Sequence, residues 1–161
     1  MADMESDQPA VSSAQAVLDK VKSLPYKTLF TWNEYNSMGR PCHMTDTDGV
    51  SSLIIWGYDG LYPVALLRNV NPSLFDSTVH STGAYKTIMG WNGLSAVNES
   101  TFRGIKNSAV TVWGWKPFVG MTKVTGPDSR TMTYSYDSFG RLEYVTGPDG
   151  KVNTKYTYKL K

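Results

Sequence analysis

The chain contains few of the side chains that perform chemistry, and their spacing does not assemble a reactive site. His43 and His80 are the only histidines, and Cys42 is the only cysteine. A structural zinc site needs four ligands from Cys, His and carboxylate side chains, and neither histidine has such a set at ligand spacing. We therefore predict no metal ion, and the single cysteine cannot form a disulfide within the chain.

Aspartates in predicted turns are the second group of candidates, because turn carboxylates can bind Ca²⁺. Each of them also stands where Asp stabilises a turn by itself, and no EF-hand loop is present. No nucleophile motif and no glycine-rich phosphate loop accompanies them. We predict a role in turns, no catalytic residue and no cofactor. The aspartates concerned are Asp46, Asp48, Asp128, Asp137 and Asp149.

Tryptophan side chains are the third group, because an exposed indole ring can stack on a sugar. Trp32, Trp56, Trp113 and Trp115 lie in predicted strands, where cross-strand aromatic pairing is the expected role. Trp91 stands in a Gly-Trp-Asn-Gly sequence outside these strands. It is the one aromatic residue that we predict to contact a ligand or partner.

Length and composition indicate one domain. The chain has 161 residues with ten Tyr and five Trp, which fits an all-β protein. A net charge of +2 gives no electrostatic case for binding nucleic acid. No apolar run approaches the length of a membrane span, and the acidic start resembles no signal peptide. We expect either an intracellular protein or a piece of a longer exported one.

The elements that must position these side chains form a repeat. The sequence Val-Thr-Gly-Pro-Asp at residues 124–128 returns 21 residues later, at residues 145–149. Alternating Thr- and Tyr-rich stretches predict strands between the turns, and a fixed spacing of this kind indicates a repeat architecture. An earlier stretch fits the same frame, and a degenerate copy begins at Trp113. The matching residues are Tyr35, Asn36, Gly39, Arg40, Asp48 and Gly49 in the first copy, and Tyr136, Asp137, Gly140, Arg141, Asp149 and Gly150 in the last.

The Tyr-Asp-x-x-Gly-Arg-Leu sequence at residues 136–142, followed by Asp-Gly and Tyr-x-Tyr, resembles the YD repeat of RHS (rearrangement hot spot) proteins. The pair of units resembles the C-terminal YD-repeat region of large Bacteroidetes proteins. In RHS proteins, many such repeats wind into a shell around a cargo polypeptide, often a toxin, at the cell surface or in secretion systems. Because this chain has too few copies to close a shell, the resemblance implies a segment, a cap or a small relative.

We therefore predict an all-β fold in which antiparallel YD-repeat hairpins form a meander in two units, residues 28–69 and 110–161. Residues 1–27 are expected to form a disordered tail and a short helix whose apolar stripe packs on the sheet. Residues 53–56 are expected to form a central strand that is buried on both faces. Residues 70–109 form an irregular, part-helical insert, with a helix near 94–104, and are the best place to look for a functional site.

The predicted function is a non-enzymatic structural or interaction module that forms part of an RHS/YD-repeat assembly. Its expected partners are other YD-repeat segments or copies of itself, joined through sheet edges. By resemblance the protein acts outside the cell or at its surface. The alternative is a cell-surface protein that binds glycans through exposed aromatic residues. An enzyme would need a pocket with convergent polar groups in the insert.

Overall fold

The computed structural model describes residues 14–24, 27–87 and 92–159. In these residues nine strands form one antiparallel sheet in which every strand pairs with its neighbours in sequence. The predicted all-β meander is confirmed, and the two repeat stretches share this sheet because β4 and β5 pair directly. The strands are β1 Phe30–Tyr35, β2 Pro41–Asp46, β3 Ser51–Gly57, β4 Tyr62–Arg68, β5 Ala109–Lys116, β6 Gly120–Thr125, β7 Thr131–Tyr136, β8 Leu142–Thr146 and β9 Val152–Lys155.

The insert folds into helices α2 (Pro72–Val79) and α3 (Ala96–Arg103), with the 3₁₀ turn η2 (Ala84–Lys86) between them. The Asn71 side chain accepts from Leu74 N–H at the start of α2, and Ser95 caps α3 in the same way. The predicted helix that ends at Gly104 is confirmed. Helix α2 is not among the elements that the sequence predicts, because an Asn-Pro pair is also typical of loops. Here Asn71 is an N-cap and Pro72 lies in the first turn of the helix.

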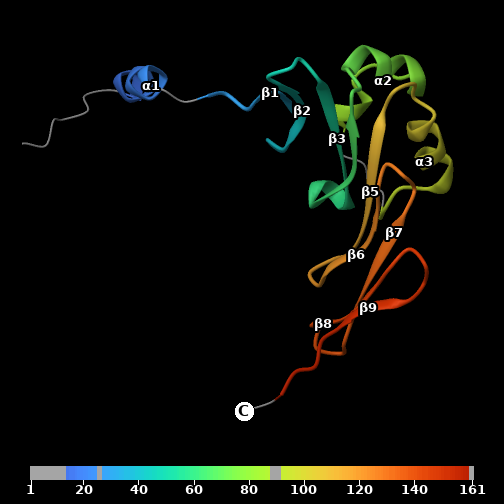
Figure 1. Ribbon diagram of the computed structural model, residues 1–161. Coiled ribbons are helices and arrows are strands. Elements are labelled where there is room, and N and C mark those ends of the chain that lie inside the picture. The colour runs from blue at the N-terminus through green and yellow to red at the C-terminus, as the bar shows by residue number, and fades with distance from the viewer. Residues whose placement is uncertain (1–13, 25–26, 88–91, 160–161) are drawn as a thin grey trace, which may run out of the picture.

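The helices cover one face of strands β3 to β5, and the hydrophobic core lies between them and the sheet (Figure 1). Leu53, Ile55 and Leu67 from the strands meet Phe75 and Phe102 from the helices, and all five are buried. On the opposite face of β3, Ile54 and Trp56 are only half-buried. The prediction that this strand is buried on both faces is wrong, because the insert covers one face only.

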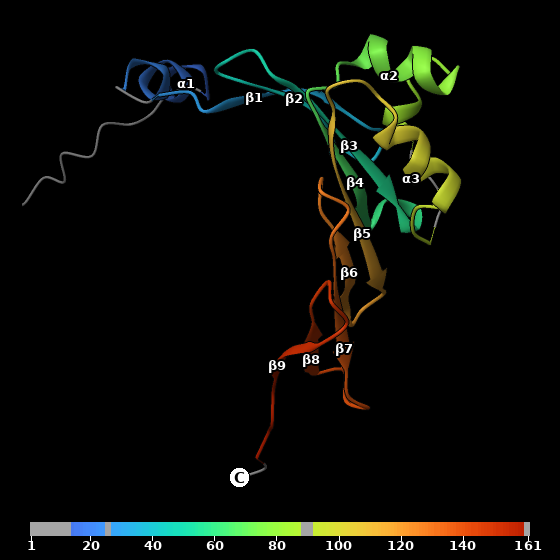
Figure 2. The same ribbon diagram turned by 45° about the vertical axis from the view of Figure 1, so that its right-hand side comes forward.

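Strands β6 to β9 continue the sheet beyond the helices as a single layer (Figures 1 and 2). Val145 is the one buried apolar side chain in these four strands, and every residue of β9 is exposed. Without a second layer, this half of the sheet depends on its turns and on contacts between neighbouring strands. The repeat motif supplies both.

The predicted N-terminal helix is present as α1 (Ala14–Ser23), but its predicted packing on the sheet is wrong. Val17, Leu18, Val21 and Leu24 are 40–51% exposed, and no residue of α1 is buried. Figures 1 and 2 both draw α1 apart from the sheet, whose helical face is already occupied by α2 and α3. Among the described residues, no helix has the length and apolar character needed to span a membrane.

Candidate functional site

The repeat motif builds tight turns of one geometry at five hairpins. In each turn the first N–H bonds the fifth carbonyl and the fourth N–H bonds the first carbonyl, at 2.8–3.2 Å. The fourth residue has a φ of 62–79°, in the left-handed region, which explains why it is glycine at four of the five turns. The turns are residues 36–40, 46–50, 126–130, 137–141 and 147–151.

One Asp or Asn oxygen completes every one of these turns. Asn36, Asp46 and Asp137 stand first, and their Oδ1 atoms accept from the third and fifth N–H groups at 2.9–3.0 Å. Where glycine stands first, Asp128 and Asp149 stand third and accept from the fifth N–H at 3.1 Å. These side chains therefore hold backbone donors, which is the ordinary use of Asp and Asn in turns.

A second contact repeats through the sheet, and we call it the aromatic clasp. An aromatic side chain at or beyond the end of an odd-numbered strand donates its N–H or O–H to a carbonyl at the start of the preceding strand. The bond is 2.7–2.9 Å long in all four cases. The donor and acceptor pairs are Trp56 and Pro41, Trp115 and Pro63, Tyr136 and Met121, and Tyr158 and Leu142.

The arginine of the repeat motif packs on the clasp ring. The guanidinium of Arg40 lies 5.4 Å from the centre of the Trp56 ring, and that of Arg141 lies 4.4 Å from the centre of the Tyr158 ring. Each arginine directly precedes the residue whose carbonyl the same ring bonds. Arg141 also forms an ion pair with Asp137 at 2.8 Å, so the motif joins the turn to the clasp.

The other two clasps use uncharged residues at the position of the arginine. Tyr62 stacks on Trp115 with ring centres 5.0 Å apart and an angle of 17° between the planes. Gly120 leaves room for Tyr136, because a Cβ atom on Gly120 would lie 2.8 Å from Tyr136 Cζ. The residue before the clasp carbonyl therefore always faces the ring, although its side chain differs.

The clasps divide the sheet into four structural units, each made of an even-numbered strand and the odd-numbered strand that follows. The insert stands in the second unit, where the other units have an Asp-containing turn. Sequence reasoning missed these contacts. In three of the four clasps their signal is an aromatic residue 15 or 16 positions after the acceptor, as in Pro41 and Trp56 or Leu142 and Tyr158, whereas the insert separates Pro63 from Trp115 by 52 positions.

Tyr35 occupies the position of a clasp aromatic at the end of β1, but no strand precedes it in the sheet. Its side chain is 53% exposed. Within the described part of the chain, its hydroxyl has no hydrogen-bond partner. Of the two tyrosines of the predicted motif, Tyr136 is therefore engaged and Tyr35 is not.

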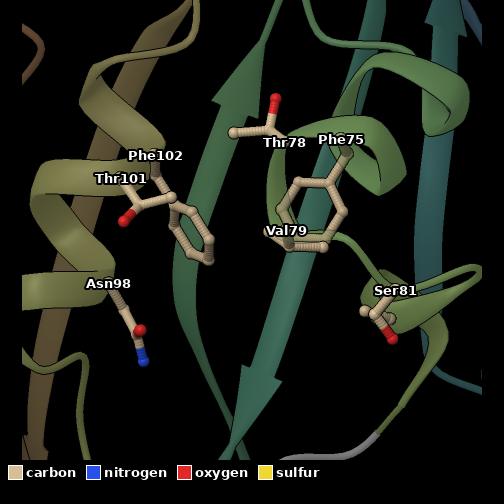
Figure 3. Close-up of a pocket in the computed structure, with 8 residues that line it drawn as sticks. Phe75, Thr78, Val79, Ser81, Asn98, Thr101 and Phe102 are labelled. Carbon is tan, nitrogen blue, oxygen red and sulfur yellow. The ribbon is translucent and has the colours of Figure 1, made fainter.

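An open groove of about 360 Å³ lies between α2 and α3 (Figure 3). Phe75 and Phe102, with ring centres 5.4 Å apart, form part of its apolar wall. Thr78 and Thr101 also line the groove, but their hydroxyls already donate to helix carbonyls. The described residues that line the groove include no titratable side chain. The groove therefore lacks the convergent acid and base groups that an enzyme in the insert would need.

A polar cluster joins η2 to the first three strands. Glu34 Oε2 accepts from the Tyr85 hydroxyl at 3.0 Å and forms an ion pair with Lys86. His43 Nε2 lies 2.9 Å from Ser51 Oγ, and His43 Nδ1 lies 3.5 Å from Glu34 Oε1. This order of Ser, His and Glu resembles a hydrolase triad, but Nδ1 makes no hydrogen bond and Glu34 is engaged by Tyr85 and Lys86. The cluster fastens the insert to the sheet.

The contacts within the cluster favour a negatively charged Glu34 and a positively charged Lys86. The hydrogen bond from Lys86 lowers the pKa of Glu34, and that same bond raises the pKa of Lys86. Burial, assisted by the hydrogen bond to Glu34, raises the pKa of Tyr85 to about 12. Burial also raises the pKa of Cys42, whose thiol donates to Glu34 O at 3.4 Å. The cysteine is therefore a protonated, buried thiol and not a reactive thiolate.

The remaining sequence candidates lie apart from one another. His80 is the C-cap of α2, and none of the contacts of the His43 cluster involves it. Among residues 14–24, 27–87 and 92–159, no group of three or more His, Cys, Asp or Glu side chains could hold a metal ion. Trp91 lies outside the described residues, so its contact with a ligand or partner stays a prediction.

Comparison with known proteins identifies the repeat. The family model for the RHS Repeat matches residues 120–152, from the start of β6 to the start of β9. This stretch contains the Tyr136 clasp, the ion pair of Arg141 with Asp137, and three of the five turns. No curated protein sequence matches the chain.

Proposed function

Because residues 120–152 of this chain are an RHS repeat, we propose that the protein is a structural module that extends a larger RHS-type sheet through its two outer strands. Its partners in this proposal are other YD-repeat segments or further copies of the same chain. The module has no catalytic role, and it works at the cell surface or outside the cell as a segment of a shell or surface protein. The RHS match supports this setting.

The observation that carries the proposal is that both outer strands are exposed. All four residues of β9 are exposed, and β9 pairs only with β8. Tyr156 N–H bonds Glu143 O in β8, so the N–H of the preceding residue, Lys155, points away from β8. An edge of this kind offers backbone donors and acceptors to an added strand.

The proposal is tested by measuring the mass of the chain with light scattering over a range of concentrations. We expect the mass to rise above the monomer value of 17.9 kDa as concentration increases. Lys155→Pro removes the outward N–H without removing a bond to β8, and should weaken this association. Lys155→Ala is the matched control, because it keeps the N–H. A monomeric mass for all three proteins at every concentration would count against self-association through β9.

Glycan binding is a second candidate, and one observation favours it. Tyr156 and Tyr158 are 42% and 44% exposed, and they line an open pocket of about 290 Å³ together with Asp137 and Arg141. Exposed rings can stack on sugar C–H groups, while carboxylate and guanidinium groups bind hydroxyls. A glycan array separates the two candidates, because an edge-pairing module has no reason to retain a sugar.

A further inference from the structure

Tyr35 stands at the position of a fifth clasp residue, and no acceptor for it lies among the described residues. An aromatic residue lies near the end of β3, β5 and β7 and just after β9. Each of these side chains donates a hydrogen bond to a carbonyl of the preceding strand. Strand β1 ends in Tyr35, which stands directly before the Asn36 turn, just as Tyr136 stands directly before the Asp137 turn. Tyr136 bonds Met121 O at 2.8 Å. Tyr35 pairs with Pro41 of β2, but no strand of the described sheet lies on the other side of β1 to offer it a carbonyl.

We propose that the β1 edge receives an antiparallel strand from another RHS-type repeat, and that Tyr35 recognises this strand by closing the missing clasp. The Tyr35 hydroxyl donates to a carbonyl near the start of the incoming strand. The residue before that carbonyl packs on the Tyr35 ring. This inference rests on the proposed function, and it assigns recognition to one edge and one side chain.

The occupied clasps define what the incoming strand must offer. Arg40 and Arg141 pack on their rings, and the carbonyls of the next residues, Pro41 and Leu142, accept the bond. Tyr62 and Gly120 hold the position of the arginine in the other two clasps. The preferred partner is a strand that opens with arginine followed by a residue with a free carbonyl. A guanidinium over a tyrosine face adds a cation–π contact that an arbitrary edge strand would lack.

The register of the existing sheet also fixes where the incoming carbonyl lies. Lys123 pairs with Thr133, so Met121 faces Ser135, the residue directly before Tyr136. The same register on β1 puts the acceptor opposite Glu34, directly before Tyr35. A strand seated in this way would also run beside Phe30 and Trp32, which are 47% and 37% exposed on β1.

Among the described residues that precede β1, none completes this clasp. Residues 27–29 before β1 belong to no strand, and residues 14–23 form the helix α1. The edge at β9 differs, because the ring that follows β9, Tyr158, is already bonded to Leu142. Of the two outer strands, only β1 therefore presents a clasp ring that awaits a partner.

The test uses the full chain and a synthetic peptide with the sequence of residues 139–147, Phe-Gly-Arg-Leu-Glu-Tyr-Val-Thr-Gly, which contains the Arg141-Leu142 pair. Hydrogen exchange followed by mass spectrometry reports which strand the peptide protects. We expect protection of residues 30–35 that saturates with peptide concentration. Tyr35→Phe removes only the hydroxyl. It should weaken peptide binding by about 2- to 10-fold, which corresponds to the net contribution of one hydrogen bond to the binding free energy.

Two controls separate recognition by Tyr35 from general edge pairing. Tyr158→Phe removes the hydroxyl of an occupied clasp at the far edge and should leave binding to β1 unchanged. A peptide with alanine in place of the arginine should bind β1 more weakly than the original. Equal binding by the Tyr35→Phe protein and the unaltered chain would overturn the role assigned to Tyr35.

The remaining outcomes distinguish this inference from the proposed function. Protection of β9 alone would overturn recognition at β1 and leave the edge-pairing module standing. No protection at either edge at millimolar peptide, together with a monomeric mass at all concentrations, would overturn both.

Discussion

Asparagine stands first in the turn at residues 36–40, where the last repeat has aspartate, and this difference predicts opposite effects for two substitutions. Asn36 Oδ1 accepts from Met38 N–H at 3.0 Å and from Arg40 N–H at 2.9 Å. Its Nδ2 atom is buried and has no hydrogen-bond partner among the described residues. At the equivalent position, the second oxygen of Asp137 accepts from Arg141 Nε at 2.8 Å. Asn36→Asp should therefore stabilise the protein, and Asn36→Ala should destabilise it.

The expected magnitudes follow from these contacts. Alanine removes two hydrogen bonds from a side chain that is 7% exposed, and each contributes roughly 0.5–1.5 kcal/mol. The loss in the free energy of unfolding is therefore about 1–3 kcal/mol, with a lowering of Tm by roughly 2–4 °C per kcal/mol. Aspartate keeps both bonds, removes the unpaired amide donor and offers Arg40 an ion pair. After the cost of burying the new charge, which the ion pair and the two backbone donors offset, we expect a net gain of about 0.5–1 kcal/mol.

Urea unfolding followed by tryptophan fluorescence measures these changes, because Trp32 and Trp56 lie in β1 and β3 on either side of this turn. Ser37→Ala is a suitable control, since Ser37 is exposed in the same turn and should tolerate the change. The gain from Asn36→Asp should disappear in acid as the new carboxylate becomes protonated. An Asn36→Asp protein that is less stable than the unaltered chain at neutral pH would refute the equivalence of the two turns.

Two further predictions concern the clasp and the polar cluster. Gly120→Ala should destabilise the protein by about 1–3 kcal/mol, because its Cβ would overlap the Tyr136 ring, and urea unfolding should show that Tyr136→Ala removes most of this cost. Glu34 has a pKa below its ordinary 4.5, so its contribution to stability is present above that pH and is lost as pH falls through the lower folded value. Glu34→Gln should flatten this part of the stability profile below pH 4.5, and an unchanged acid slope would contradict the assignment.

The turns could be predicted from the sequence because their physics is local. The acceptor oxygen, the backbone donors and the left-handed residue of a turn all lie within five positions, as in residues 137–141. Asp and Gly at these positions therefore predict the turn, and the rest of the chain is not needed for this prediction. The same holds for Ser95 and Gly104, which bound α3, and it would have held for Asn71 and Pro72 at α2.

The clasps and the polar cluster could not be predicted in the same way, because their partners are distant in sequence. Trp115 is 52 residues from the Pro63 carbonyl, and Tyr85 is 51 residues from Glu34. Their formation depends on the register of the sheet and on the fold of the insert, neither of which local spacing determines. The packing predicted for α1 failed for a related reason, since a helical stripe indicates an apolar face but not what covers it.

The position of the insert explains why one half of the sheet has a core and the other half does not. The insert replaces a turn between β4 and β5, which still pair from Ala65 with Val112 to Arg68 with Ala109. The entropy of closing a loop rises only slowly with its length, so a connection of this size leaves the strand pairing and the Trp115 clasp intact. The insert then covers β3 to β5 with helices. Strands β6 to β9 keep short turns that cover neither face, and they are held by those turns, by strand pairing and by the clasps. The outer half of this sheet, most of which lies in the stretch that matches the RHS Repeat, is therefore held by contacts between neighbouring strands. Under this condition further strands can be added without disturbing a core.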